Sequence, residues 1–185
     1  MRRILNLVRI FVVFAFLVLL VSSSFNAEAE KDPVWTWSSS SSITNVAISS
    51  DSTNISATYA QSVSLWKNDT SFPHNPYNTK TLGDGIRYME MSVDGKYVLT
   101  GEETNKLTLW EEGTKVWDKG GFLAGLYGID ISADGSNITA VDRRNVYFFD
   151  KSSSTEVWNK NFATQEMATA RISPDGRYVA AGTFD

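Results

Sequence analysis

The chain has 185 residues, with 17 Lys and Arg against 21 Asp and Glu, a formal net charge of −4 and an isoelectric point near 5.1. This acidic balance argues against a nucleic-acid partner, because binding to phosphate backbones needs clustered Lys and Arg. The absence of cysteine from the sequence excludes disulfides and a lipidated cysteine, and it favours a fold held together by core packing.

Residues 1–29 have the organisation of a signal peptide. A basic start, Met1-Arg2-Arg3, precedes an apolar run from Ile10 to Val21, and Ala27-Glu28-Ala29 has the small-x-small pattern of a cleavage site. An uncleaved membrane anchor is the alternative, although a spanning helix needs about 20 apolar residues. In either case we expect an N-terminal hydrophobic helix and a following domain that is extracytoplasmic, either secreted or at the cell surface.

Four copies of one short phrase recur through residues 33–185. They are ISSDS at 48–52, MSVDG at 91–95, ISADG at 131–135 and ISPDG at 172–176. A period of about 40–45 residues indicates a repeat architecture. Asp-Gly favours a tight hairpin, because glycine accepts a positive φ, so the first copy, with Asp51-Ser52, is expected to build its turn differently. The residues predicted to form the repeated turns are Asp51, Asp94, Gly95, Asp134, Gly135, Asp175 and Gly176.

Segments rich in β-branched and aromatic residues flank each turn and alternate with a period of two, which predicts half-buried strands. A heavy aromatic residue ends the third strand of each unit, and another stands in the fourth. We interpret these aromatics as packing between units rather than as stacking platforms for a ligand. They are Trp35, Trp66, Trp110, Trp117, Phe149 and Trp158. Val34 to Trp37 is expected to form an outermost strand without a unit of its own.

The stretch MSVDGKYVLTGEETNKLTLWEE at 91–112 resembles the WD-repeat family of β-propellers, and ISPDGRYVAAGTFD at 172–185 resembles the start of another such unit. DKSSSTEVW at 150–158 is similar to the tryptophan-bearing segment of quinoprotein-type propellers. The Gly-His and Trp-Asp pairs of WD repeats are absent, since Trp66 is followed by Lys67 and Trp110 by Glu111. The hydrogen-bond network that those pairs anchor is therefore not expected in its usual form.

The resemblance implies an all-β fold over residues 33–185, with three to four blades of four antiparallel strands in an incomplete ring. Repeat units are expected near residues 43–82, 86–118, 126–160 and 168–185. A single blade cannot bury both of its faces, so it must stack on neighbours. We interpret the sequence as a truncated propeller that continues in the same chain. The alternative is a half-propeller that a second chain completes.

The remaining polar residues favour structural roles. The turn aspartates could form a ring of carboxylates, but hydrogen bonding within each turn explains their position better. Glu102-Glu103, Glu111-Glu112 and Asp69 could bind a divalent cation, yet their spacing matches no calcium loop. His74, the only histidine, falls in the irregular stretch 67–85 and is expected on a surface loop. Asn68 is the sequon asparagine expected to carry a glycan, if the host glycosylates.

The sequence holds no nucleophile elbow, HExxH motif, phosphate loop or dinucleotide fingerprint, so we assign no catalytic residue, metal or cofactor. The first hypothesis is an exported, non-catalytic binding or scaffold propeller that contacts a protein partner through loops near 67–85, 119–127 and 160–168. The alternative is a fragment of a quinoprotein-like oxidoreductase, for which the resemblance implies PQQ and calcium. A third hypothesis is a propeller that helps to assemble envelope proteins. Only residues 1–29 are expected to contact a membrane.

Overall fold

The structure, a computed structural model, describes residues 36–68 and 75–184. The chain divides into two compact units, Met1–Thr36 and Trp37–Asp185. The predicted signal segment, Trp35, Asp69 and His74 lie outside the described residues. No helix in the described part has the length and apolar character needed to cross a membrane.

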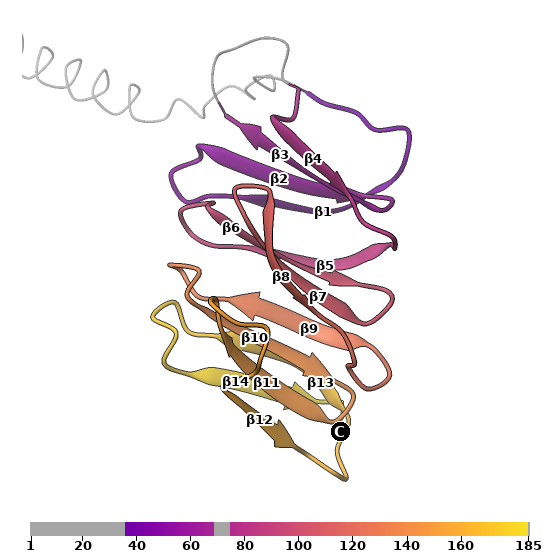
Figure 1. The fold of residues 1–185 in the computed structure, drawn as a ribbon, viewed down its shortest axis with the longest axis vertical. Helices are drawn as coiled ribbons and strands as arrows, with labels where there is room; N and C mark the ends of the chain where they lie inside the picture. Colours follow the sequence, from indigo (N-terminus) through magenta and orange to yellow (C-terminus); the bar gives the residue numbers. More distant parts are fainter. Residues whose placement is uncertain (1–35, 69–74, 185) are drawn as a thin grey trace, which may run out of the picture. The chain divides into compact units, whose positions relative to one another are not determined.

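The second unit is all-β. Its described strands form three four-stranded antiparallel sheets and one two-stranded sheet, each in chain order (Figure 1). The strands are β1 (Ile43–Ile48), β2 (Asn54–Tyr59), β3 (Ser62–Lys67), β4 (Asn78–Thr81), β5 (Ile86–Met91), β6 (Tyr97–Glu102), β7 (Lys106–Glu111), β8 (Thr114–Lys119), β9 (Leu126–Ile131), β10 (Asn137–Asp142), β11 (Asn145–Asp150), β12 (Trp158–Asn161), β13 (Met167–Ile172) and β14 (Val179–Thr183).

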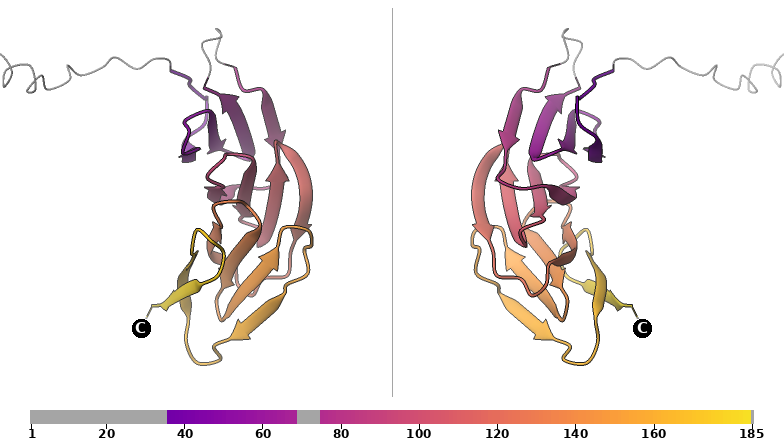
Figure 2. Two further views of the ribbon diagram at one scale, coloured as in Figure 1. Left: turned by 90° about the vertical axis from the view of Figure 1, so that its left-hand side faces the viewer. Right: turned by 90° about the vertical axis from the view of Figure 1, so that its right-hand side faces the viewer.

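Successive sheets lie side by side through their first strands. β1 contacts β5, β5 contacts β9, and β9 contacts β13. Figure 2 shows the sheets following one another from β1–β4 to β13–β14. This arrangement confirms the predicted fold class, which is a β-propeller with an open ring. We name the sheets blade 1 (β1–β4), blade 2 (β5–β8), blade 3 (β9–β12) and blade 4 (β13–β14).

The apolar core lies between blades. One buried cluster joins blades 1 and 2 and consists of Val63, Leu65, Leu82, Ile86, Met89, Val98 and Trp110. A larger cluster joins blades 2 and 3, and a third joins blades 3 and 4. Because each cluster draws side chains from two successive blades, burial of apolar surface depends on stacking.

Two of the third-strand aromatics, Trp110 and Phe149, occupy these interfaces, whereas Trp66 packs against Trp37. Trp66, Trp110 and Phe149 are 2%, 7% and 0% exposed. Trp117, on the fourth strand of blade 2, is also buried, and its Nε1 donates to the Lys151 carbonyl of blade 3 at 2.8 Å. Trp110, Phe149 and Trp117 therefore lie in cores between blades, whereas Trp66 is buried outside the three clusters.

Trp158 differs from this pattern. Its ring is 40% exposed and stacks on Phe148 of its own blade, with centroids 5.5 Å apart and planes 1° from parallel. Trp117, at the equivalent place in blade 2, is covered by Phe149 from the third strand of the next blade, with ring centroids 5.8 Å apart. Blade 4 has two described strands, so no described third strand covers Trp158 in the same way. The position of Trp158 in a core between blades therefore stays a prediction.

Two segments also differ from the sequence prediction. Thr36 and Trp37 belong to no strand, and Trp37 instead packs on blade 1, with its ring 5.0 Å from Trp66 and 5.1 Å from Tyr59. The stretch 67–85, expected to be irregular, contains β4, which pairs with β3. The β4 sequence, Asn-Thr-Lys-Thr, has no apolar alternation, because this strand is mostly exposed at the edge of blade 1.

Candidate functional site

The repeated turns share one hydrogen-bond network built from a serine and an aspartate two residues later. In the second copy, the Ser92 hydroxyl donates to Asp94 Oδ1 at 2.6 Å and accepts from the Tyr97 N–H at 2.9 Å. The Lys96 N–H donates to the same carboxylate oxygen at 3.0 Å. The other copies repeat these three bonds around Ser49-Asp51, Ser132-Asp134 and Ser173-Asp175.

The first copy builds the same turn as the others, so the expectation of a different turn is wrong. Ser52 adopts a φ of 60°, close to the 70° of Gly95. The difference lies in what surrounds the turn. A Cβ at Gly95 would stand 2.5 Å from the Asn54 Cβ of the preceding blade, whereas Ser52 is exposed. Serine is tolerated at 52 because this position is exposed.

Backbone hydrogen bonds link the four turns from blade to blade. The N–H of Ser50 donates to the Val93 carbonyl, that of Val93 to the Ala133 carbonyl, and that of Ala133 to the Pro174 carbonyl, each at 2.9 Å. Pro174 has no N–H, so the series of donors ends at blade 4. We call this series the turn ladder. The turn ladder and the apolar clusters together fix the spacing of successive blades.

The hydrogen bonds lower the pKa of Asp51, Asp134 and Asp175. The Ser49 hydroxyl is the largest cause for Asp51, and the Thr53 N–H and hydroxyl add to it, so that the pKa falls to about 2. The Ser136 hydroxyl lowers the pKa of Asp134 most, also to about 2. Carboxyl groups that stay ionised at neutral pH are poor proton shuttles, so these aspartates serve the turns rather than acid–base chemistry.

A second network replaces the one that the absent Gly-His and Trp-Asp pairs would anchor. In blade 2 the Trp110 Nε1 donates to Thr100 Oγ1 at 3.0 Å, and the Thr108 hydroxyl donates to Glu102 Oε1 at 2.8 Å. The Glu102 side chain is fully buried, and its Oε2 lies 2.9 Å from the Lys106 Nζ. The hydrogen bond with Glu102 raises the pKa of Lys106, although burial opposes the shift. The sequence did not predict this ion pair, because a glutamate and a lysine four residues apart on either side of a hairpin match no motif.

Blade 3 satisfies the corresponding carboxylate, Asp142, in another way. This fully buried group accepts from the Leu123 N–H, the Tyr147 hydroxyl, and the Arg144 and Asn145 N–H groups. Burial acts to raise the pKa of Asp142, but the Tyr147 hydroxyl and the backbone donors outweigh it and lower the pKa. Because Leu123 lies in the connection from blade 2, Asp142 ties that loop to the sheet.

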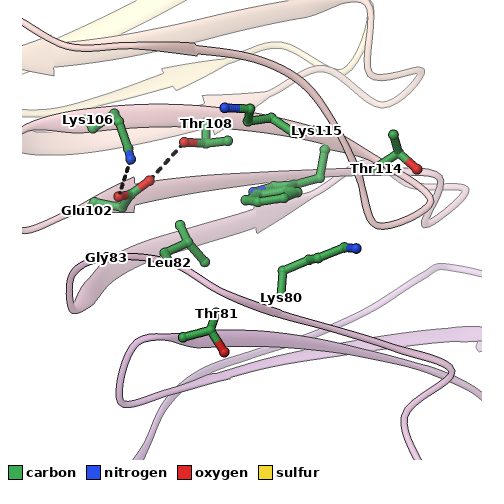
Figure 3. Close-up of a pocket in the computed structure, with 10 residues that line it drawn as sticks. Lys80, Thr81, Leu82, Gly83, Glu102, Lys106, Thr108, Thr114 and Lys115 are labelled. Atoms are coloured by element: carbon green, nitrogen blue, oxygen red, sulfur yellow. Dashed lines mark hydrogen bonds and ion pairs between the residues drawn. The ribbon is translucent and has the colours of Figure 1, made fainter.

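A cleft of about 400 Å³ lies between blades 1 and 2 (Figure 3). Leu82 and Trp110 supply apolar walls, and three lysines, Lys80, Lys106 and Lys115, also line the cleft. Hydroxyl and backbone groups complete the lining with Thr81, Gly83, Thr108 and Thr114, beside Glu102. We call this recess the inter-blade cleft.

The lysines of the inter-blade cleft differ in their partners. Lys106 is paired with Glu102, and Lys115 lies 2.6 Å from Asp118, whose pKa this hydrogen bond lowers. Lys80 forms no ion pair within residues 36–68 and 75–184. The cleft therefore offers positive charge and hydroxyl groups beside an apolar surface, and its one carboxylate is already paired. This chemistry suits recognition of an acidic group more than acid–base catalysis.

The other predicted residues lie apart from this cleft. Glu111 pairs with Lys96 at 2.7 Å. Asn68 is exposed, and its side chain donates to the Ser52 carbonyl at 2.8 Å. No three His, Asp or Glu side chains of the described segments come together as metal ligands would.

Comparison with known proteins identifies the fold alone. No family model matches the sequence, and no curated protein matches it. Among solved structures, that of U3-55K, a WD40 β-propeller protein, matches with a TM-score of 0.62 at 15% identity, covering 74% of this chain and 44% of that one. The chain thus has a WD-like β-propeller fold and spans less than half the length of that structure. The 1221 solved chains that match show how widely the fold is shared, so fold alone does not decide function.

Proposed function

We propose that this chain is an exported, non-catalytic β-propeller that binds a protein partner, and that the inter-blade cleft belongs to its binding surface. The observation that carries the proposal is Lys80, an exposed cation without a described ionic partner, beside the apolar Leu82 and Trp110. The connecting segments 120–125 and 162–166 extend the candidate surface, because loops on a rigid scaffold are where recognition concentrates.

The chemistry of the cleft favours an acidic segment with apolar side chains as the occupant. A carboxylate would meet Lys80, and a neighbouring apolar side chain would contact Leu82 and Trp110. The chain as a whole carries a net charge of −4, so general attraction would not draw such a segment to it. Binding of an acidic segment would therefore report on the local charge of the cleft.

A labelled decapeptide of alternating Glu and Leu tests this proposal against the 185-residue chain. We expect saturable binding that weakens as salt is added, because charge pairs at a rim are screened. Lys80→Glu is expected to weaken binding about tenfold or more, which corresponds to ~1.4 kcal/mol. Arg177→Glu, at a 78% exposed side chain on the turn of blade 4, serves as the matched control and is expected to bind as the unmodified chain does. Equal losses in the two variants would refute the assignment to the cleft.

Export is a separate part of the proposal and rests on residues 1–29. We expect the protein isolated outside the cytoplasm to begin at Glu30, because the small-x-small pattern ends at Ala29. N-terminal sequencing of that material tests this directly. Recovery of the chain in the cytoplasm with Met1 retained would contradict export, and membrane-bound protein that retains residues 1–29 would favour an anchor.

A further inference from the structure

The registers of the third and fourth strands define equivalent positions in blades 1, 2 and 3. One such position holds a lysine of the fourth strand, opposite an apolar residue of the third strand. The pairs are Lys80 with Val63, Lys119 with Leu107, and Lys160 with Val146. The side chains that line the inter-blade cleft between blades 1 and 2 therefore have counterparts at the interface between blades 2 and 3.

The lysine of blade 2 has an ionic partner in blade 3. The Lys119 Nζ lies 2.9 Å from Glu156 Oε2, and both side chains are about three-quarters buried. The sequences KVWDK, which begins at Lys115, and EVWNK, which begins at Glu156, align through the strand registers. The inter-blade cleft thus has a lysine, Lys115, where the next interface has a carboxylate, and Lys80 of blade 1 lines the same cleft (Figure 3).

The side chain beside the buried carboxylate also differs between the two interfaces. In blade 3 the Tyr147 hydroxyl donates to Asp142 Oδ2 at 2.6 Å, and in blade 2 the Thr108 hydroxyl donates to Glu102 Oε1 at 2.8 Å from the equivalent position. The Tyr147 ring packs edge-to-face on Phe122, which follows blade 2 in the chain, with ring centroids 5.1 Å apart. Threonine has no ring, so Thr108 lines a recess where Tyr147 fills the interface.

We propose that the partner segment places an aromatic ring and a carboxylate together in the inter-blade cleft. The ring takes the place that Tyr147 fills at the next interface, against the apolar walls of the cleft. The carboxylate takes the place of Glu156, beside Lys80 and Lys115. This inference rests on the proposed function, and it specifies that an aromatic residue accompanies the acidic one.

The charges of the cleft agree with this assignment. No described residue forms an ion pair with Lys80. Lys115 is paired with Asp118, but these side chains are 55% and 37% exposed, and an exposed pair of this kind contributes little. A carboxylate of the partner can therefore share Lys115 with Asp118. The ring adds apolar burial, since an aromatic side chain buries about 150–250 Å² on entering such a site.

Three labelled decapeptides test the two groups separately on the 185-residue chain. A peptide of alternating Glu and Tyr is expected to bind at least about tenfold more tightly than one of alternating Glu and Leu, because its ring fills the recess over Thr108. A peptide of alternating Gln and Tyr keeps the rings and lacks the carboxylates. It is expected to bind at least about tenfold more weakly than the Glu–Tyr peptide.

A double variant of the chain supplies the missing carboxylate from within. Lys115→Glu with Asp118→Asn transfers to blade 2 the pair Glu156 and Asn159, whose side chains hydrogen-bond at 3.2 Å in blade 3. The new carboxylate is expected to pair with Lys80, so that the Glu–Tyr peptide binds about tenfold or more weakly and the midpoint of thermal unfolding rises by about 2 °C. The reverse exchange in blade 3, Glu156→Lys with Asn159→Asp, lies outside the cleft and is the matched control, expected to leave binding unchanged.

The outcomes separate this inference from the proposed function. Equal affinity of the Glu–Tyr and Glu–Leu peptides, with binding still weakened by Lys80→Glu, would overturn the aromatic requirement and leave the proposed function standing. Unchanged binding to the variant at 115 and 118, or equal losses in the two double variants, would overturn the place given to the carboxylate. Binding of none of the peptides would overturn both proposals.

Discussion

The Gly135→Ala substitution tests whether the turn of a blade requires glycine because a side chain of the preceding blade packs over that turn. Gly135 has a φ of 73°, and an added Cβ would overlap the ring of Tyr97 from blade 2. The left-handed conformation costs a non-glycine residue about 1–2 kcal/mol. Overpacking against a fixed neighbour costs a further ~1–3 kcal/mol.

The Tyr97 ring has little room to move aside. It is 6% exposed, and its hydroxyl donates to Glu111 at 3.0 Å and accepts from Lys151 at 3.2 Å. We therefore expect Gly135→Ala to lower the free energy of unfolding by about 2–5 kcal/mol in urea denaturation. Ser52→Ala is the matched control. Its φ of 60° is already strained and its site is exposed, so we expect a change within ~0.5 kcal/mol.

A double-mutant cycle separates the two contributions. With Tyr97→Ala in the background, Gly135→Ala is expected to cost only the backbone contribution of about 1–2 kcal/mol. The difference between the two backgrounds measures the contact between blades. Two results would contradict this explanation. In the first, Gly135→Ala lowers the free energy of unfolding no more than Ser52→Ala does. In the second, its effect is the same with and without the Tyr97 ring.

Three further predictions concern buried polar groups and pH. Thr100→Val keeps the shape of the side chain but leaves the buried Trp110 Nε1 without its acceptor, so we expect a loss of about 1–2 kcal/mol in urea denaturation; no loss would mean that this bond is not formed. Lys106→Met leaves the buried Glu102 carboxylate without its cation, and the expected loss is about 2 kcal/mol at pH 7 in urea denaturation; an unchanged free energy of unfolding would contradict this. The pKa values of Asp51 and Asp134, at about 2, lie below those of the unfolded chain, so their stabilisation is complete above about pH 4 and is lost as the pH falls towards 2. Asp134→Asn is expected to flatten this part of the pH–stability profile, and an unchanged slope would count against the turn network.

The fold could be predicted from the sequence because its signals are local and repeated. The serine–aspartate turn closes within six residues, so the network around Ser92 and Asp94 needs no distant partner. The third-strand aromatics follow from period and size. The identical turn at Ser52 could not be predicted, because whether a residue at positive φ is tolerated depends on the neighbouring blade.

The site was less accessible to sequence reasoning, because its members meet only across blades. Lys80 and Trp110 approach the same cleft from blades 1 and 2, and neither stands in a motif. β4 escaped prediction because its edge position needs no apolar alternation. The exposure of Trp158 depends on which residues pack against blade 3, and the period of the repeat does not specify those residues.

Amide exchange at the turn ladder tests the stacking of blades most directly. Ser50 and Val93 stand in exposed turns, and only a carbonyl of the following blade explains protection of their N–H groups. We expect the amides of Ser50, Val93 and Ala133 to exchange about a hundredfold or more slowly than in an unstructured peptide. Exchange at the unstructured rate at these three positions, with the strands still protected, would contradict the account.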